Sequence, residues 1–102
     1  MVKLIYVYLV VVQDKDKKKQ VAELLKIDLD KTKVSENADQ TKIIDILQYV
    51  YNHLQKRNDG NKVYKIVQAS RSLNGGPFIN YASYLQSHFE GDQAELFVDI
   101  DI

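Results

Sequence analysis

The sequence contains no cysteine, and this absence excludes two kinds of site. Without cysteine there is no disulfide framework and no metal site built on thiolates. The chain also has no net charge, because 14 basic residues balance 14 acidic ones. A balanced chain has no overall field that would draw it onto nucleic acid or an acidic membrane. The length of 102 residues and the apolar fraction of 45% predict one small globular domain.

The apolar run from Val2 to Val12 is too short to span a bilayer. It is also a poor signal peptide, because only Lys3 flanks it, no small-residue cleavage site follows, and Tyr6 and Tyr8 interrupt it. We therefore interpret it as a strand. We expect a protein that does not enter the membrane and that stays in the cell that makes it.

Apolar patterns predict four strands, over residues 2–12, 25–30, 62–70 and 96–102. Both faces of the first strand are apolar, whereas the second and fourth alternate apolar with charged or aromatic residues. The charged stretch "QDKDKKKQ" after the first strand predicts a loop. A competing interpretation makes Lys17 to Leu25 a short helix.

Two amphipathic helices are predicted between the later strands. Asp39 can cap the first helix and Gly60 can end it. Its apolar residues recur at helical spacing: Ile43, Ile46, Leu47, Val50 and Leu54. The second, shorter helix starts at Pro77 and ends at Gly91. Its stripe consists of Phe78, Ala82, Leu85 and Phe89.

Two pairs of similar segments suggest an internal duplication. "AELLKIDLD" at 22–30 resembles "AELFVDID" at 94–101, and "YVYNHL" at 49–54 resembles "YLQSHF" at 84–89. The simplest interpretation is a strand–helix unit used twice, in two related motifs at about residues 1–60 and 61–102. The alternative is that amphipathic elements resemble one another by chance.

The predicted class is α/β, with the element order β-β-α-β-α-β and α+β as the alternative. In this arrangement a four-stranded mixed sheet carries both helices on one face, and the second to fourth strands run parallel. The other face would carry aromatic and aliphatic side chains, and such a patch on a monomer usually binds something. The predicted binding residues of that face are Tyr6, Tyr8, Tyr64, Ile66 and Phe97.

A second candidate site is a cleft beside Arg71 and the Gly75-Gly76-Pro77 turn. A helix start with unbonded amides and an arginine can hold a phosphate or carboxylate, although a plain turn explains the same residues. Arg71 therefore joins the predicted partner-binding residues.

Carboxylates and histidines provide the only hints of catalytic chemistry. Asp28-x-Asp30 and Asp99-x-Asp101 each resemble a Mg²⁺ site, but the solvent side of an amphipathic strand explains them better. His53 and His88 lie beside the helical stripes and are interpreted as half-covered boundary residues. The sequence therefore predicts no enzyme, no metal site and no cofactor.

The favoured function is a non-enzymatic module that binds a peptide or protein segment on a sheet edge, on the exposed face or in a cleft. A homodimer is a second use for the same surface. The first alternative is a nucleic-acid-binding protein that uses the Lys15–Lys19 loop and surface tyrosines, although the neutral charge argues against it. The second alternative is a small metal-dependent hydrolase.

The chain as a whole, with its opening "MVKLIYVYLVVV", is rich in tyrosine, lysine and isoleucine and free of cysteine. In length and composition it resembles the small proteins of viruses that infect hyperthermophilic archaea, in particular the filamentous viruses of Acidianus. The resemblance implies a viral interaction protein in the host cytoplasm. It carries over no functional residue.

Overall fold

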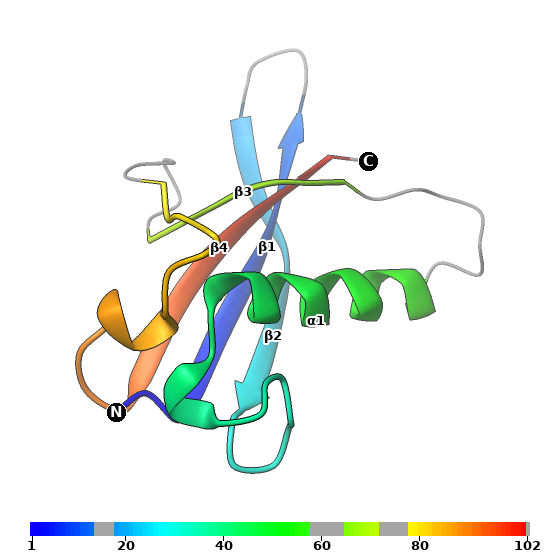
Figure 1. Ribbon diagram of the computed structural model, residues 1–102. Helices are drawn as coiled ribbons and strands as arrows, with labels where there is room; N and C mark the ends of the chain where they lie inside the picture. The colour runs from blue at the N-terminus through cyan, green and yellow to red at the C-terminus, as the bar shows by residue number, and fades with distance from the viewer. Residues whose placement is uncertain (14–17, 58–64, 72–77, 102) are drawn as a thin grey trace.

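The computed structural model describes residues 1–13, 18–57, 65–71 and 78–101. Within these ranges the chain forms strands β1 (Leu4–Gln13) and β2 (Lys18–Asp28), the 3-10 helix η1 (Ala38–Gln40) and helix α1 (Ile43–Arg57). Strand β3 (Lys65–Ser70), the 3-10 helix η2 (Leu85–Ser87) and strand β4 (Gln93–Asp101) follow. Figure 1 shows α1 crossing one face of the sheet. The class is α+β-like.

The strands form one mixed sheet in the order β2-β1-β4-β3. β1 pairs antiparallel with β2 and parallel with β4, and β3 pairs antiparallel with β4. The parallel pair therefore lies in the centre, and β2 and β3 form the two edges. The predicted four-stranded mixed sheet is confirmed. The predicted parallel course of the second to fourth strands is wrong, because β3 and β4 run in opposite directions.

The core lies between α1 and the sheet. The predicted helical stripe is confirmed, since its five residues are all buried: Ile43, Ile46, Leu47, Val50 and Leu54. The sheet contributes alternate residues of its strands to the same cluster, among them Ile5, Val7, Leu9, Ile27, Leu96 and Val98. Spacing of three and four residues on the helix and of two on the strands directs both sets of side chains into one layer.

The two faces of β1 have different environments. Ile5, Val7 and Leu9 enter the core, and the alternate residues Tyr6 and Tyr8 point to the opposite face, where they are half-buried. Since α1 covers only the core side (Figure 1), this second face of the sheet is uncovered by any described helix.

The second predicted helix is wrong in the part of the segment that the structure describes. Residues 78–91 contain the 3-10 turn η2, isolated β-bridges at Phe78 and Tyr84, and otherwise irregular backbone. Asn80 explains part of this, because its side chain accepts a hydrogen bond from Ala82 N–H (2.9 Å) and its carbonyl accepts one from the Ser83 hydroxyl. Such local bonds offer the backbone an alternative to the helix. Gly91, the predicted helix end, has φ = 82° and leads into β4.

Helix α1 begins at Ile43 and is not capped by Asp39, which lies in η1. Instead, Asp45 of the first turn accepts a hydrogen bond from Lys42 N–H (2.9 Å). The segment after β3 satisfies two further amides, because Ile43 N–H donates to Ser83 O (3.0 Å) and Ile44 N–H to Tyr81 O (2.9 Å). The start of α1 is therefore fixed by contacts distant in sequence.

The predicted duplication is not supported by the described elements. α1 precedes β3, but only a 3-10 turn precedes β4, and β3 and β4 have opposite directions. The competing interpretation of Lys17 to Leu25 as a helix is also wrong, because β2 occupies Lys18–Asp28. Within the described residues, the repeated sequence patterns therefore coincide with shared amphipathic spacing and not with a repeated strand–helix unit.

Candidate functional site

Three of the predicted binding residues, Tyr6, Tyr8 and Phe97, lie together on the sheet face away from α1. Tyr8 pairs with Phe97 in the parallel ladder, and their rings stack with centroids 4.7 Å apart and planes inclined by 12°. We call this surface the open face, and define it by Leu4, Tyr6, Tyr8, Leu24, Lys26, Glu95 and Phe97.

Glu95 places a negative charge beside the stacked pair. The Tyr8 hydroxyl donates a hydrogen bond to Glu95 Oε1 at 3.4 Å. Partial burial and then the Glu95 carboxylate raise the pKa of the Tyr8 phenol above its ordinary value of 10. The phenol therefore stays neutral and acts as a donor at physiological pH.

Of the other predicted binding residues, Ile66 and Arg71 do not join the open face. Ile66 pairs with the buried Ile100 and packs against the core on the α1 side. Arg71 is exposed, with its guanidinium 5.3 Å from the centroid of the Phe89 ring. Tyr64 and the Gly75-Gly76-Pro77 turn lie outside the described residues, and so does the cleft predicted beside them. The six residues therefore do not form one site.

An apolar groove lies along edge strand β3, and part of it adjoins α1. It consists of two adjoining hollows of about 240 and 430 Å³ that share Tyr81. The first lies between α1 and β3 and is lined by Ile44, Leu47, Gln48, Tyr51, Ile66 and Tyr81. The second lies between β3 and the following segment and is lined by Val67, Gln68, Ala69, Phe78, Ile79, Asn80 and Tyr81. None of these lining residues is charged.

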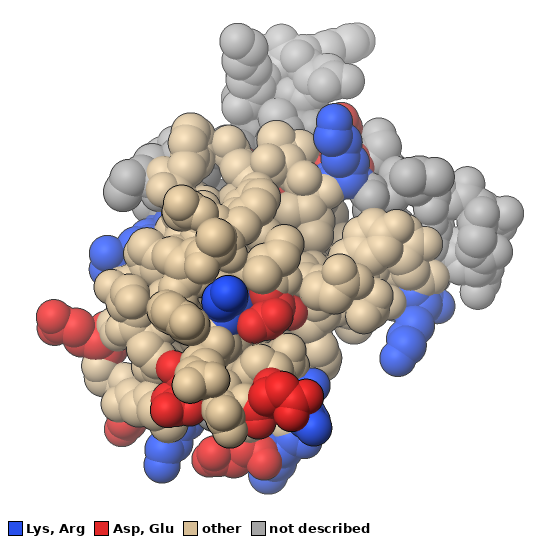
Figure 2. Space-filling model, viewed as in Figure 1, with Lys and Arg blue, Asp and Glu red and all other residues tan. Residues whose placement is uncertain are grey.

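Several large apolar side chains of the groove are exposed to solvent. Phe78 is 63% exposed and Val67 is 50% exposed, and Ile44 and Tyr51 are also exposed. Figure 2, seen from the α1 side, shows uncharged side chains over much of the upper and central surface; acidic and basic side chains lie mainly below and at the sides, with one adjoining pair near the centre. A contiguous apolar patch of this kind is a frequent mark of an interaction site.

The backbone that borders the groove is held by hydrogen bonds to β3. The Tyr81 hydroxyl donates to Val67 O (3.2 Å), and Ile79 N–H donates to Ala69 O (3.0 Å). A register shift between Ile66 and Gln68 interrupts the pairing of β3 with β4 at Val67. These contacts occupy outward carbonyls of the edge strand and fix the Tyr81 ring between the two hollows.

Of the groove residues, only Ile66 is predicted from the sequence as a binding residue. One signal was available in α1, where Ile44, Leu47, Gln48 and Tyr51 follow a second helical stripe beside the core stripe. Phe78 and Tyr81 give no such signal, because their segment matches a helical pattern. Only the pairing of this segment with β3 brings their side chains close to Val67.

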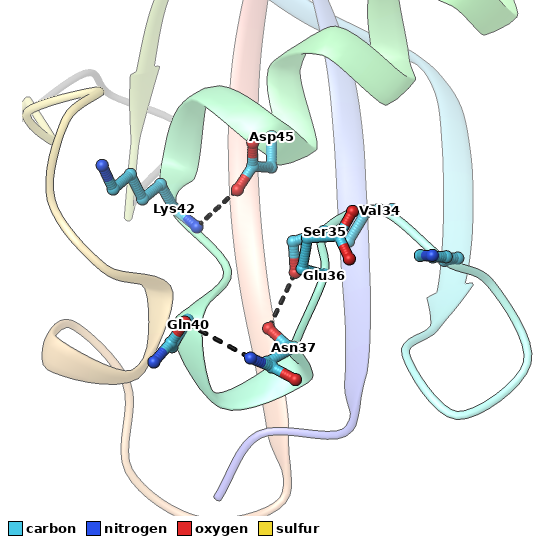
Figure 3. A pocket seen from close by; sticks show the side chains of 8 residues that line it. Val34, Ser35, Glu36, Asn37, Gln40, Lys42 and Asp45 are labelled. Atoms are coloured by element: carbon cyan, nitrogen blue, oxygen red, sulfur yellow. Dashed lines mark hydrogen bonds between the residues drawn. The ribbon is translucent and has the colours of Figure 1, made fainter.

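A more polar hollow of about 530 Å³ lies before α1 and is lined by Lys33, Val34, Ser35, Glu36, Asn37, Gln40, Lys42 and Asp45. Its polar groups bond to one another (Figure 3). The Ser35 hydroxyl donates to Asn37 O (2.8 Å), and Asn37 Nδ2 donates to Gln40 Oε1 (3.4 Å). These bonds shape the loop that leads into α1, so we assign this hollow a structural role.

The aspartate motifs have structural roles where the structure describes them. Asp28 Oδ1 accepts a hydrogen bond from Asp30 N–H (2.9 Å) in the turn that ends β2. Asp99 is buried and accepts one from Gln68 Nε2 (2.5 Å), so its interpretation as a solvent-side residue is wrong. Among the described residues, no group of three acidic, histidine or cysteine side chains is placed to hold a metal ion.

The histidines contact side chains from other parts of the chain. His53 Nε2 lies 3.3 Å from Glu23 Oε1 of β2, and both side chains are about one-third exposed. His88 Nε2 lies 2.5 Å from the Ser83 hydroxyl. Both histidines are half-buried. The Lys15–Lys19 loop of the nucleic-acid alternative lies largely outside the described residues, and none of its side chains is described.

No helix in the described part of the chain has the length and apolar character needed to cross a membrane. No protein-family model matches the sequence, and neither a curated protein nor a solved structure shows significant similarity to it.

Proposed function

We propose that the protein is a non-enzymatic interaction module whose apolar groove binds a short apolar segment of another protein. The main support is that the two hollows meet at Tyr81 and that none of the described residues lining them is charged. Among these residues a charged ligand would find no opposite charge. An apolar segment would bury the exposed Phe78, Val67, Ile44 and Tyr51 side chains along with its own.

The shape of the hollows favours peptide side chains over an enclosed small molecule. Small-molecule sites usually surround most of the ligand. Here two adjoining hollows of about 240 and 430 Å³ open at the surface. Each hollow suits one or two side chains of a segment that runs along the groove.

Side chains rather than main-chain pairing would provide the affinity. At β3 the carbonyls of Val67 and Ala69 already accept hydrogen bonds from Tyr81 and Ile79. An extended peptide would have to displace these bonds to add a strand at this edge. The aromatic rings of Tyr51, Phe78 and Tyr81 instead offer large contact area with little rotamer entropy to lose.

A matched pair of lysine substitutions tests the site. Val67 in the groove is 50% exposed and Leu24 on the open face is 49% exposed, so Val67→Lys and Leu24→Lys add the same charge at equally exposed positions. A peptide selected on the wild-type protein from a random display library is titrated against all three proteins by fluorescence anisotropy. We expect Val67→Lys to weaken binding at least about tenfold, since an anchor in the middle of a contact costs about 1.4 kcal/mol or more. Leu24→Lys should bind as the wild type does.

The opposite result, in which only Leu24→Lys loses the peptide, would move the binding site to the open face. Failure to enrich apolar peptides over charged ones would contradict the proposal outright. A single-stranded oligonucleotide in the same titration tests the first alternative. Tight oligonucleotide binding that falls steeply with salt would favour a nucleic-acid-binding protein instead.

The viral origin and the host cytoplasm belong to the same proposal. They rest on the length and composition of the whole chain. Fractionation of infected archaeal cells with an antibody to the protein tests both, and recovery in the membrane fraction would contradict the proposed location.

A further inference from the structure

The open face has a regular arrangement of charges around its apolar centre. In one row across the sheet, Tyr6 of β1 lies between Lys26 of β2 and Glu95 of β4. In the next row, Tyr8 lies between Leu24 and Phe97. Residues paired in register point to the same side of a sheet, so all six side chains share this face. A positive and a negative group therefore flank the central strand at the same level.

The open face of one copy is complementary to the open face of a second copy. Two copies can pack face to face about a two-fold axis parallel to β1. In this arrangement each β2 lies over the partner's β4, and every row of one copy faces the same row of the other. Lys26 of one copy then meets Glu95 of the other, and this contact occurs twice. In the adjacent row Leu24 meets Phe97 and the two Tyr8 rings meet at the axis. Aligned packing of two sheets, with strands inclined by about 30°, preserves these neighbours.

We propose that the open face binds a second copy of this chain in a two-fold, face-to-face dimer. Both contacts of such a dimer are attractive, one apolar and one between opposite charges. Asp28, on the same face in the row of Leu4, meets the uncharged Gln93 of the other copy and adds no repulsion. The row after Tyr8 contributes no contact to the dimer, because Val10 and Asp99 are buried within the monomer.

The size of the face indicates a weak dimer. Three strands spaced by about 4.8 Å and about five residues along each at about 3.3 Å give a projected area of roughly 240 Å². Accessible area exceeds projected area because side chains are corrugated, but a standard interface buries about 800 Å² per partner. We therefore expect dissociation in the micromolar range or above, and no effect at the low concentrations of a peptide titration.

Charge reversal tests the pairing directly. Light scattering and sedimentation equilibrium are measured over a concentration series for the wild type, Lys26→Glu and Glu95→Lys. Each single variant places like charges opposite each other twice, so its dimer dissociation constant should rise at least about tenfold. An equimolar mixture should recover dimers, because at both contacts an acidic side chain of one variant meets a basic side chain of the other. Lys31→Glu, which makes the same charge change on an exposed turn, is the control and should dimerise like the wild type.

Recovery in the mixture also shows that both variants are folded. Three outcomes would overturn the proposal. These are a wild type that remains monomeric up to about millimolar concentration, single variants that dimerise as the wild type does, and a mixture that stays monomeric. None of them bears on the apolar groove, which lies along edge strand β3 and is tested at Val67.

Discussion

At the scale of single residues, Tyr81 links three parts of the molecule. Its hydroxyl donates to Val67 O of β3, its carbonyl accepts from Ile44 N–H of α1, and its ring lines both hollows of the groove. Burial, followed by the charge of Asp99, raises the pKa of its phenol above the ordinary value of 10. The folded state therefore favours the neutral, hydrogen-bonding form of this side chain.

This pKa shift predicts a loss of stability at high pH. The contribution of Tyr81 is fully present below about pH 10, the pKa of the phenol in the unfolded chain, and disappears as the pH rises through the higher folded-state pKa. Tyr81→Phe should therefore show a smaller fall in the free energy of unfolding above pH 10 than the wild type. Urea denaturation at a series of pH values measures this. If the free energy of unfolding falls equally with pH in the two proteins above pH 10, Tyr81 makes no such contribution.

A second residue-scale prediction concerns the hydroxyls of Ser35 and Thr41, which lie 2.7 Å apart. Ser35 donates its one hydroxyl proton to Asn37 O, so it accepts from Thr41, a fully buried residue. Ser35→Ala leaves this buried hydroxyl without its acceptor and should cost about 1–3 kcal/mol. Adding Thr41→Val should recover part of that loss. A double-mutant cycle by chemical denaturation checks it, and purely additive effects would contradict the coupling.

At the scale of elements, α1 shows what sequence can predict and where it stops. The buried stripe of α1 can be predicted from residue spacing alone, because local helix geometry determines which side chains from Ile43 to Leu54 face the core. The residue at which α1 begins cannot be predicted in this way. The cap expected at Asp39 is replaced by Asp45 and by carbonyls of Tyr81 and Ser83.

The corrected start predicts different effects for two aspartates near α1. Asp45→Ala removes the acceptor of Lys42 N–H and a negative charge in the first turn, and should lower the free energy of unfolding by about 1 kcal/mol. Asp39→Ala, on an exposed residue, should change it by less than about 0.5 kcal/mol. Thermal and urea denaturation of both variants measure the two effects. A larger loss of stability for Asp39→Ala than for Asp45→Ala would indicate that Asp39 caps α1, as predicted from the sequence.

Neither the direction of the strands nor the absence of the second helix could be predicted from the sequence, and the reasons are related. The alternation of Leu96, Val98 and Ile100 predicts a strand, but the same alternation fits a parallel or an antiparallel neighbour. The pattern of Phe78, Ala82, Leu85 and Phe89 fits a helix, but Phe78 instead pairs with Ser70 and remains exposed. In both cases contacts between distant segments decide the outcome.

The same limit applies to the candidate sites at the scale of the whole molecule. Tyr6, Tyr8 and Phe97 were predicted to lie on one face, and the β1–β4 ladder places them there. Ile66 was placed on the wrong face, because the register shift at Val67 and the pairing with Ile100 turn it towards α1. The groove itself is formed by three segments of the chain, so no single stretch of sequence could reveal it.

Whole-molecule stability should depend on the side chains that enter the core more than on those of the open face. Leu96 on β4 is fully buried and Leu24 on edge strand β2 is 49% exposed. Leu96→Ala should cost about 2–5 kcal/mol, a large part of the roughly 5–15 kcal/mol of a domain this size, and lower the Tm by roughly 10 °C or more. Leu24→Ala should cost less than about 1 kcal/mol at concentrations where the chain is monomeric. Similar melting temperatures for the two variants would contradict this division.

The parallel pairing of β1 and β4 also determines how the protein would respond to mechanical force. Leu4 begins β1 and Asp101 ends β4, so tension applied between these residues pulls two neighbouring strands along their length in opposite directions. The load is then shared at once by the hydrogen bonds of the ladder from Leu4–Gln93 to Val11–Ile100, which must slide together to fail. An antiparallel hairpin pulled at its open end would instead lose its bonds one at a time. Stretched from these two points, the molecule should resist as a shear joint rather than open as a zipper.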